Sequence, residues 1–503
     1  MFPQKWRRHW ALEEDPFVQE DADKDPVLPR VPLEAVHSSF DRLYGSPDAP
    51  GPGIVFGEKG SGKSGLRLAM RRRLEAEAAD KAFVVDYVDF DGFLNEARKA
   101  DRLPPTNPKT PRRVVERFSL ADHLDAILSL GVTQLVDEIV AGEHRGAKKL
   151  PAKNKASILV LSALYYLSDE HSGVEVDRQL SKALHFRTAP SFGSQIALFV
   201  LTLLGVAIAA VPHIHPRFFQ GALDVGDPLP WYIGGGGLIA LTWLFVGAKS
   251  LLDRRRASRA TRAVRVVPRD PDPLARLFSR MPSGLKNDLA LPDGPAVGTR
   301  LVLLRRFISI LEELGYESFY VLMDRVDEAT LLAGRAELMR PFVESLLEHR
   351  LLQFEGLALK LFMPIELARL YLGASPDELK SMRLDKANSI PELRWTGQEL
   401  VQVAAQRLRA VRSPDASPEQ PGGSLGDYFD DDVGDDELRE TLGELGTPRL
   451  AFGFLGSVLA EHARELSDDL PEDSPEWRVP QRRFDILRAS WLDRARGLRR
   501  ALN

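Results

Sequence analysis

Residues 57–64, read as G-E-K-G-S-G-K-S, decide the fold class of this chain. They match the pattern G-x-x-x-x-G-K-[ST] at every fixed position, and this pattern is typical of phosphate-binding loops. The apolar residues 54–56 before the loop predict a buried strand, and residues 66–73 after it predict a helix. A strand, a glycine-rich loop and a helix in this order place the amides of the loop at a helix N-terminus, where an anion is favoured.

Each fixed position of this stretch has a chemical reason. Gly57, Gly60 and Gly62 let the backbone turn so that successive N–H groups can point at a phosphate. Lys63 supplies a positive charge to the β and γ phosphates, and Ser64 supplies a hydroxyl to Mg²⁺. The predicted nucleotide-binding set is Gly57, Glu58, Lys59, Gly60, Ser61, Gly62, Lys63 and Ser64.

Length and composition bound the possibilities. The chain has 503 residues, which favours two to four domains. With 67 basic and 72 acidic residues its net charge is −5, so bulk charge does not favour nucleic acid, and such a contact would need a local basic patch. There is no cysteine, which excludes disulfides, thiol catalysis and cysteine metal sites. The ten histidines lack zinc-binding spacing, and the first residues lack the apolar stretch of a secretory signal.

Two uncharged segments follow, at residues 194–214 and 228–248. Each is close to the roughly 20 residues that a membrane-spanning helix needs. The second contains Gly234, Gly235, Gly236 and Gly237 and is less apolar, but Trp231, Tyr232 and Trp243 suit a membrane interface. We therefore predict a transmembrane hairpin, with a buried hairpin in a soluble core as the alternative.

Charges around the two segments predict their orientation. Lys182 and Arg187 precede them, and the residues that follow are Lys249, Arg254, Arg255, Arg256, Arg259 and Arg262. The residues between the segments carry only Arg217, Asp224 and Asp227. Because basic residues stay on the cytoplasmic side, both outer flanks are expected in the cytosol. The basic run suits anionic lipid headgroups better than DNA, since no base-reading residues are interleaved with it.

A second motif follows the hairpin. A predicted helix over residues 298–314 leads into an apolar strand that ends at Asp324, and Arg325, Asp327 and Glu328 follow. A carboxylate at the tip of a strand beside a phosphate loop holds the Mg²⁺ water shell. Asp324 is therefore predicted to bind the metal together with Ser64.

The remaining pattern predicts an α/β fold with a mostly parallel sheet. Further strands are expected near residues 83–90, 356–363 and 389–395. Helices are expected near residues 33–44, 119–140, 157–167 and 397–411, and the end of the chain is expected to be helical. Residues 264–297 read as a proline-broken linker, and residues 413–437 as a flexible acidic loop. The stretch before residue 50 either packs on the domain edge or lies against the adenine.

Taken together, these residues resemble a membrane-anchored P-loop ATPase of the KAP type, within the STAND and AAA-like group. The resemblance lies in the transmembrane hairpin between Ser64 and Asp324. It implies a P-loop NTPase with an inserted hairpin and a helical C-terminal lid, in which Arg449 of the G-x-P-R stretch senses the γ phosphate. The implied division is an arm (1–50), the first half of the NTPase domain (51–190), the hairpin (191–250), a basic juxtamembrane linker (251–297), the second NTPase half (298–400) and the lid with its acidic loop (401–503).

One departure concerns catalysis. The KAP type usually shows paired acids at the strand tip, whereas Arg325 follows Asp324 in this chain. The base that activates water is therefore sought further on: Glu328 has the longer reach to the γ phosphate, and Asp327 is expected to pair with Arg325.

The sequence thus predicts an ATPase that uses ATP and Mg²⁺ and lies in the inner (cytoplasmic) membrane, with the NTPase domain and both termini in the cytosol. Its expected catalytic residues are Lys63, Asp324, Asp327 and Glu328. The family suggests a nucleotide-dependent switch or scaffold in bacterial signalling or antiviral defence, with lipid, an unknown protein and further copies of itself as partners. The alternatives are a tethered AAA-like motor acting on DNA or protein and a scaffold without hydrolysis. A membrane-remodelling GTPase is disfavoured, because residues 154–157 do not complete an N-K-x-D guanine motif.

Overall fold

The structure is a computed structural model. It describes residues 2–32, 37–167, 173–186, 192–214, 229–372, 388–416, 421–467 and 469–502. The chain divides into two compact units. The first unit joins Met1–Phe90 to Tyr316–Asn503, and the second is Asp91–Gly315. The two ends of the chain therefore belong to one unit, and the intervening residues form the other.

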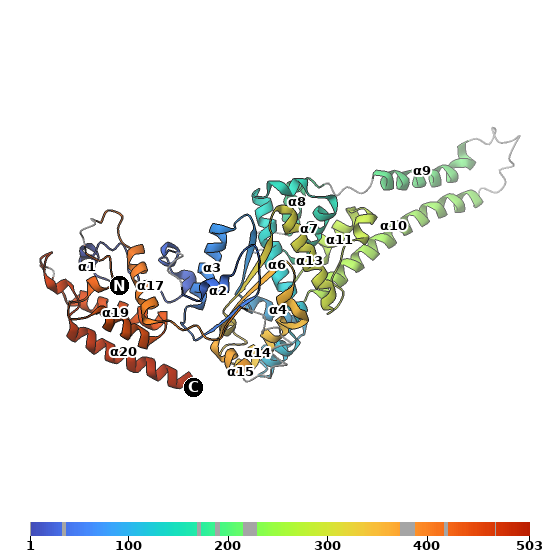
Figure 1. Ribbon diagram of the computed structural model, residues 1–503. Coiled ribbons are helices and arrows are strands. Elements are labelled where there is room, and N and C mark those ends of the chain that lie inside the picture. Colours follow the sequence, from blue (N-terminus) through green and yellow to red (C-terminus); the bar gives the residue numbers. More distant parts are fainter. Residues whose placement is uncertain are drawn as a thin grey trace. The chain divides into compact units, whose positions relative to one another are not determined.

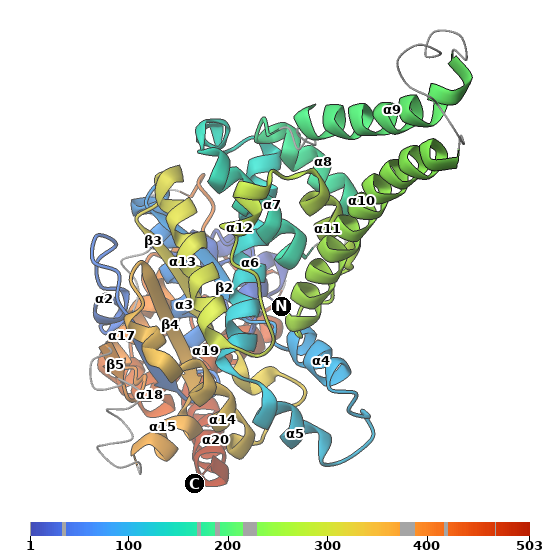
Figure 2. The same ribbon diagram turned by 90° about the vertical axis from the view of Figure 1, so that its right-hand side faces the viewer.

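A five-stranded sheet organises the first unit, and all its described strand pairs are parallel. Its strands in spatial order are β2 (Ala82–Tyr87), β3 (Ser318–Met323), β4 (Leu357–Pro364), β1 (Gly53–Gly57) and β5 (Asn388–Ile390). The strands lie side by side in Figure 2. The prediction of an α/β fold with a parallel sheet is confirmed, and β4 lies between β1 and β3.

The strands form where the sequence is continuously apolar. Every residue of β1, β3 and β4 is buried, as expected for parallel strands that are covered on both faces. Helix α3 (Lys63–Glu77) packs Leu66, Met70 and Leu74 into one core with residues of the sheet. Helices α2 (Phe40–Tyr44) and α15 (Ile365–Leu372) also contact the strands, and α14 (Ala336–Leu346) packs on α15.

Four helices follow the last strand, and we call them the C-terminal helices. They are α17 (Gly397–Ala410), α18 (Asp435–Leu445), α19 (Pro448–Glu465) and α20 (Gln481–Leu502). A capping box between Thr396 and Glu399 starts α17, which satisfies two amides that would otherwise lack partners. The C-terminal helices share one apolar core, which confirms the expected helical end of the chain.

The N-terminal arm (residues 2–32) packs into this same core. It contains helix α1 (Gln4–His9) and two short 3₁₀ helices, η1 (Ala22–Lys24) and η2 (Leu28–Arg30). Its buried apolar side chains are Phe2, Trp6, Trp10, Leu12, Phe17, Val27 and Val31. The arm therefore belongs structurally to the C-terminal helices, although about 370 residues separate the two in the sequence.

Helices are the only regular secondary structure among the described residues of the second unit. Its helices are α4 (Asp91–Ala100), α5 (Thr110–Arg117), α6 (Leu120–Ala141), α7 (Ala152–Tyr165), α8 (Gly173–Ala183), α9 (Phe192–Ile214), α10 (Leu229–Ala263), α11 (Pro271–Arg280), α12 (Ser283–Asn287) and α13 (Val297–Leu314). A buried ion pair joins Arg300 of α13 to Asp125 of α6 at 3.3 Å, and Tyr165 donates to Asp125 at 2.8 Å. Helices α6, α7 and α13 confirm three predicted helices.

Helices α9 and α10 are long and apolar enough to cross a membrane. They lie beside each other (Figure 1). Their backbones approach closely at Gly235, where a Cβ would lie only 2.7 Å from the Ala209 nitrogen. Their outer side chains are uncovered, and Phe199 and Phe245 are 65% and 72% exposed. The described chain therefore does not bury this pair in a core, which argues against the alternative of a soluble hairpin.

Several local expectations differ from the structure. Residues 264–297 are not a linker, since they form α11 and α12 and bury Val266, Val267 and Phe278. Residues 421–437 of the acidic segment are also structured, because Tyr428 and Phe429 enter the core of the C-terminal helices. The helix expected over residues 33–44 is short, since α2 begins at Phe40; residues 33–36 lie outside the described part. Arg187, Arg217, Asp224 and Asp227, which entered the orientation argument, are also outside it.

Candidate functional site

The loop of residues 57–64 connects β1 to α3. Its glycines Gly60 and Gly62 have φ angles of +85° and +92°, a left-handed conformation that side chains rarely adopt. Gly62 directly precedes Lys63, the first residue of α3. The predicted strand–loop–helix arrangement is confirmed, and it directs the free N–H groups of the first turn of α3 toward the loop.

Lys63 lies inside this loop. Its Nζ donates to the carbonyl oxygen of Gly57 at 2.8 Å and to that of Glu58 at 3.0 Å. The residue is only 8% exposed. Burial lowers the pKa of Lys63, while the nearby carboxylates of Asp327 and Asp324 act in the opposite direction. The loop thus holds a nearly enclosed amine next to two acids.

Asp324 directly follows β3 and is 1% exposed. Its Oδ1 accepts from the Arg325 amide at 2.9 Å, and its Oδ2 lies 3.3 Å from Nε of Arg67. Burial raises the pKa of Asp324, and Ser64 and Arg67 oppose that shift. Because β4 lies between β3 and β1, the ends of these two strands are about 10 Å apart. The predicted pair Ser64 and Asp324 nevertheless lines the same cavity.

The two later acids lie in the 3₁₀ turn η4 (Val326–Glu328). Nη1 of Arg325 lies 3.4 Å from Oε2 of Glu328, so Glu328 is the acid of this turn that pairs with Arg325. This corrects the expectation that Asp327 would do so. Among the charges that raise the pKa of Lys63, that of Asp327 acts most strongly. Asp327 is half-buried in this turn, whereas Glu328 is exposed.

Arg449 comes to the loop from the start of α19. Its amide donates to the Gly60 carbonyl at 3.3 Å, and a Cβ on Gly60 would lie 2.7 Å from the Cβ of Arg449. Trp395 also reaches the loop, since its indole Nε1 donates to the Ser61 carbonyl at 2.7 Å. The predicted γ-phosphate sensor thus touches the loop, and the C-terminal helices close one side of the site.

The remaining predicted loop residues have different surroundings. The Glu58 carbonyl accepts from the Ser61 amide at 3.1 Å. The Ser61 hydroxyl is buried and has no hydrogen-bond partner among the described residues. Lys59 is exposed and lines a cavity beside the loop. Of this group, Lys59 is therefore the one that adds positive charge to the cavity.

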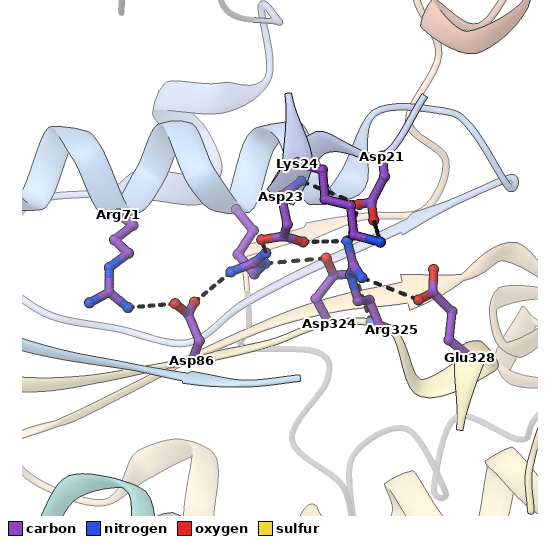
Figure 3. A network of polar contacts seen from close by, with 9 residues as sticks. Asp21, Asp23, Lys24, Arg71, Asp86, Asp324, Arg325 and Glu328 are labelled. Atoms are coloured by element: carbon purple, nitrogen blue, oxygen red, sulfur yellow. Dashed lines mark hydrogen bonds and ion pairs between the residues drawn. The ribbon is translucent and has the colours of Figure 1, made fainter. Parts of the chain in front are cut away.

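Figure 3 shows a network of charges that our sequence analysis missed. The buried Arg67 of α3 donates from Nη1 to Asp86 at 2.8 Å and contacts Asp23 of the arm through Nη2, in addition to Asp324. Arg325 contacts Asp21 at 2.5 Å and also Asp23. One signal for part of this network was present in the sequence, because Lys63 and Arg67 are four residues apart and share a helix face.

A cavity of about 440 Å³ joins these parts. This volume lies in the range of small-molecule sites, ~300–1,000 Å³. Its charged part is lined by the loop, Asp324, Arg325, Asp327, Glu328 and Arg449. Its apolar part is lined by the arm and the C-terminal helices, with Phe17, Val31, Pro32 and Phe452. All of these residues belong to the first unit.

The described residues contain no group of three or more His, Cys, Asp or Glu side chains that could hold a metal ion by themselves. Comparison with models of protein families, with curated proteins and with solved structures finds no match for this chain. The interpretation of the site thus depends on its own geometry and chemistry.

Proposed function

We propose that this chain is a membrane-anchored protein that binds ATP with Mg²⁺ and hydrolyses it. The observation that carries the proposal is the position of Lys63, which sits in a glycine loop at the start of α3 and faces the buried Asp324 at the end of β3. A lysine, a helix N-terminus and a carboxylate around one cavity suit a polyphosphate with a divalent cation.

The shape of the cavity supports a nucleotide as the ligand. A triphosphate needs the charged part of the cavity, and a base needs apolar walls. Phe17 of the arm and Phe452 of α19 stack with ring centroids 5.7 Å apart, and both line the cavity. This arrangement favours the hypothesis that the arm lies against the adenine, although the arm also packs on the C-terminal helices.

Mg²⁺ fits the residues at the charged end. Mg²⁺ prefers oxygen ligands and is commonly bound through one or two carboxylates together with substrate phosphates. The Ser64 hydroxyl and the Asp324 carboxylate both line the cavity beside the loop. When bound there, the ion would neutralise charge on the phosphate oxygens. Ser64 and Asp324 would hold it, and Lys63 would balance the remaining negative charge.

Hydrolysis requires a carboxylate that orients and deprotonates water. Asp327 and Glu328 both line the cavity. Glu328 is held by Arg325, whereas Asp327 faces the loop lysine. We therefore assign the role of general base to Asp327 and not to Glu328. If neither acid supports turnover, the chain is a nucleotide-gated scaffold.

ATP binding is tested by calorimetric titration of the detergent-purified full-length protein. With Mg²⁺ present, saturable binding of one ATP per chain is expected, because the first unit contains one such loop in its described residues. Removal of Mg²⁺ with EDTA should weaken the affinity, since the phosphate charge would then be balanced only by basic side chains of the cavity such as Lys63. The absence of saturable binding in Mg²⁺ would contradict the proposed function.

Membrane anchoring is proposed from α9 and α10. Because their apolar side chains are uncovered, full-length protein is expected to stay in the membrane pellet after an alkaline wash. The chain has no cysteine, so single cysteines can report topology. An Ala222→Cys variant should react with an impermeant maleimide from the outside of the cytoplasmic membrane, and an Asp473→Cys variant should react only after lysis.

Two results would contradict this part of the proposal. Recovery of the full-length protein in the supernatant would mean that the two helices are covered by another protein or by a second copy. Labelling of Asp473→Cys from the outside would mean that the orientation is reversed.

A further inference from the structure

Two arginines of the cavity have an Nε–H group that donates no hydrogen bond within the described residues. The Nε groups of Arg325 and Arg449 are both buried, and neither has a hydrogen-bond partner among the described residues. Both side chains line the cavity beside the 57–64 loop. Buried donors of this kind normally have partners, so these two point to an anionic ligand that would complete them.

In the structure, carboxylates of a single arm segment face these two arginines. Arg325 pairs with Asp21 at 2.5 Å and with Asp23 (Figure 3), and Nε of Arg449 lies 3.5 Å from Oε2 of Glu20. Asp21 also accepts from the Asp23 amide at 3.3 Å at the start of η1, which fixes both carboxylates on one side of the turn. The arm therefore presents a compact group of negative charges where phosphates are proposed to bind.

The C-terminal helices hold this segment on both sides. Arg407 of α17 donates to the Pro16 carbonyl at 2.8 Å and forms a buried ion pair with Asp25 at 2.7 Å. Since these contacts flank residues 20–23, the acidic group is not a free tail. Its position follows that of the C-terminal helices.

Arg325 itself has an unusual backbone. Its φ of +64° is left-handed, a conformation that non-glycine residues rarely adopt. This conformation allows its amide to donate to Asp324 at 2.9 Å while its guanidinium lies in the cavity. The side chain of the residue beside the proposed metal ligand is therefore directed into the cavity.

Asp21 is ionised at neutral pH in this arrangement. Burial acts to raise its pKa, but the hydrogen bond and the charge of Arg325 outweigh it, and the pKa lies below its ordinary value. An ionised carboxylate and a phosphate repel each other at short range. The arm carboxylates and a triphosphate therefore cannot both be paired with Arg325.

We propose that Arg325 binds the γ phosphate of a nucleoside triphosphate, and that Asp21 and Asp23 hold this arginine when no nucleotide is bound. This inference rests on the proposed function. ATP then has to displace the carboxylates from Arg325, whereas ADP does not reach it. Because the C-terminal helices hold the arm, this exchange couples the presence of the γ phosphate to their position.

The test compares ATP and ADP affinities by calorimetry in the full-length protein with Mg²⁺. In Asp21→Asn/Asp23→Asn, the affinity for ATP should rise about tenfold, which corresponds to about 1.4 kcal/mol, and that for ADP should change little. Asparagine can still accept the hydrogen bond at the start of η1, and Arg67 keeps Asp86 and Asp324 as partners. Arg325→Ala should lower ATP affinity and leave ADP affinity nearly unchanged.

A combined variant separates this inference from general electrostatics. If the carboxylates act through Arg325, the gain from Asp21→Asn/Asp23→Asn should disappear in the Arg325→Ala background. Asp41→Asn is the matched control, since Asp41 pairs with Arg73 at 2.6 Å and does not line the cavity. Thermal unfolding of each variant shows whether it is folded. If the double variant is unstable, Asp21→Asn alone should show a smaller gain of the same kind.

Three results would overturn the inference. They are unchanged ATP affinity in the Asn variants, a gain that persists without Arg325, and equal losses of ATP and ADP affinity in Arg325→Ala. In each of these cases ATP binding by the wild type would leave the proposed function standing. If the wild type binds no ATP, both fail.

Discussion

Lys63→Ala is expected to weaken ATP binding by about 10²-fold. Lys63 is the lysine enclosed by the 57–64 loop, and its Nζ is held by the carbonyls of Gly57 and Glu58. We expect it to make two charge-assisted hydrogen bonds to phosphate, each worth about 1.5 kcal/mol or more. Their loss corresponds to roughly two powers of ten in the dissociation constant. Calorimetric titration with ATP and Mg²⁺ measures the change directly.

The matched control is Lys81→Ala. Lys81 precedes β2 and forms exposed ion pairs with Asp48 at 3.1 Å and Glu317 at 3.5 Å. Lys81 does not line the cavity, so the ATP affinity of Lys81→Ala should equal that of the wild type. Equal ATP affinity in the wild type and Lys63→Ala would mean that the 57–64 loop does not bind ATP.

Asp327→Asn is expected to leave ATP bound and to lower turnover at least ~10²-fold, the usual effect of removing a general base. Asp327 faces Lys63 across the cavity, and an asparagine has nearly the same shape but cannot accept a proton. Release of phosphate under saturating ATP measures turnover, and the titration used for Lys63 measures binding.

Glu328→Gln is the comparison for this prediction. Because Glu328 is exposed and paired with Arg325, its loss should lower turnover less than the loss of Asp327. A larger effect at Glu328 would support the prediction from the sequence, which rests on the longer reach of Glu328 and on pairing of Asp327 with Arg325. Wild-type protein that binds ATP without turnover would instead support the scaffold.

The parts of the fold that could be predicted are those encoded by short-range pattern. Continuous apolar runs predicted the strands β1, β3 and β4, and periodic apolar residues predicted α6 and α13. The order of the strands was not predictable, because the position of β4 between β1 and β3 depends on contacts between distant segments.

Residues 264–297 show how prolines can mislead. Prolines in this segment predict breaks, but Pro271 stands in the first turn of α11, where proline is favoured, and Asp270 caps the helix. The prediction of a flexible loop for the acidic segment differs from the structure for a related reason. Its charges predicted flexibility, while Tyr428 and Phe429 were the residues that fix it in a core.

The candidate site divides in the same way. The 57–64 loop and Asp324 could be identified because their residue types stand at fixed spacings. The role of Asp21 and Asp23 could not, because about 300 residues separate them from Arg325 and no local pattern links the two. The different roles of Asp327 and Glu328 could not be predicted either, because the conformation of the turn decides which acid forms an ion pair with Arg325.

The most direct test of the central claim is photoaffinity labelling with 8-azido-ATP in the presence of Mg²⁺, followed by identification of the labelled peptides. If ATP occupies the cavity of the first unit, label should appear in residues 17–32 or 448–456, which line its apolar part. Excess ATP should prevent the labelling, and Lys63→Ala should reduce it strongly. Label confined to the second unit, or labelling that excess ATP does not prevent, would contradict the proposal that this loop and cavity bind ATP.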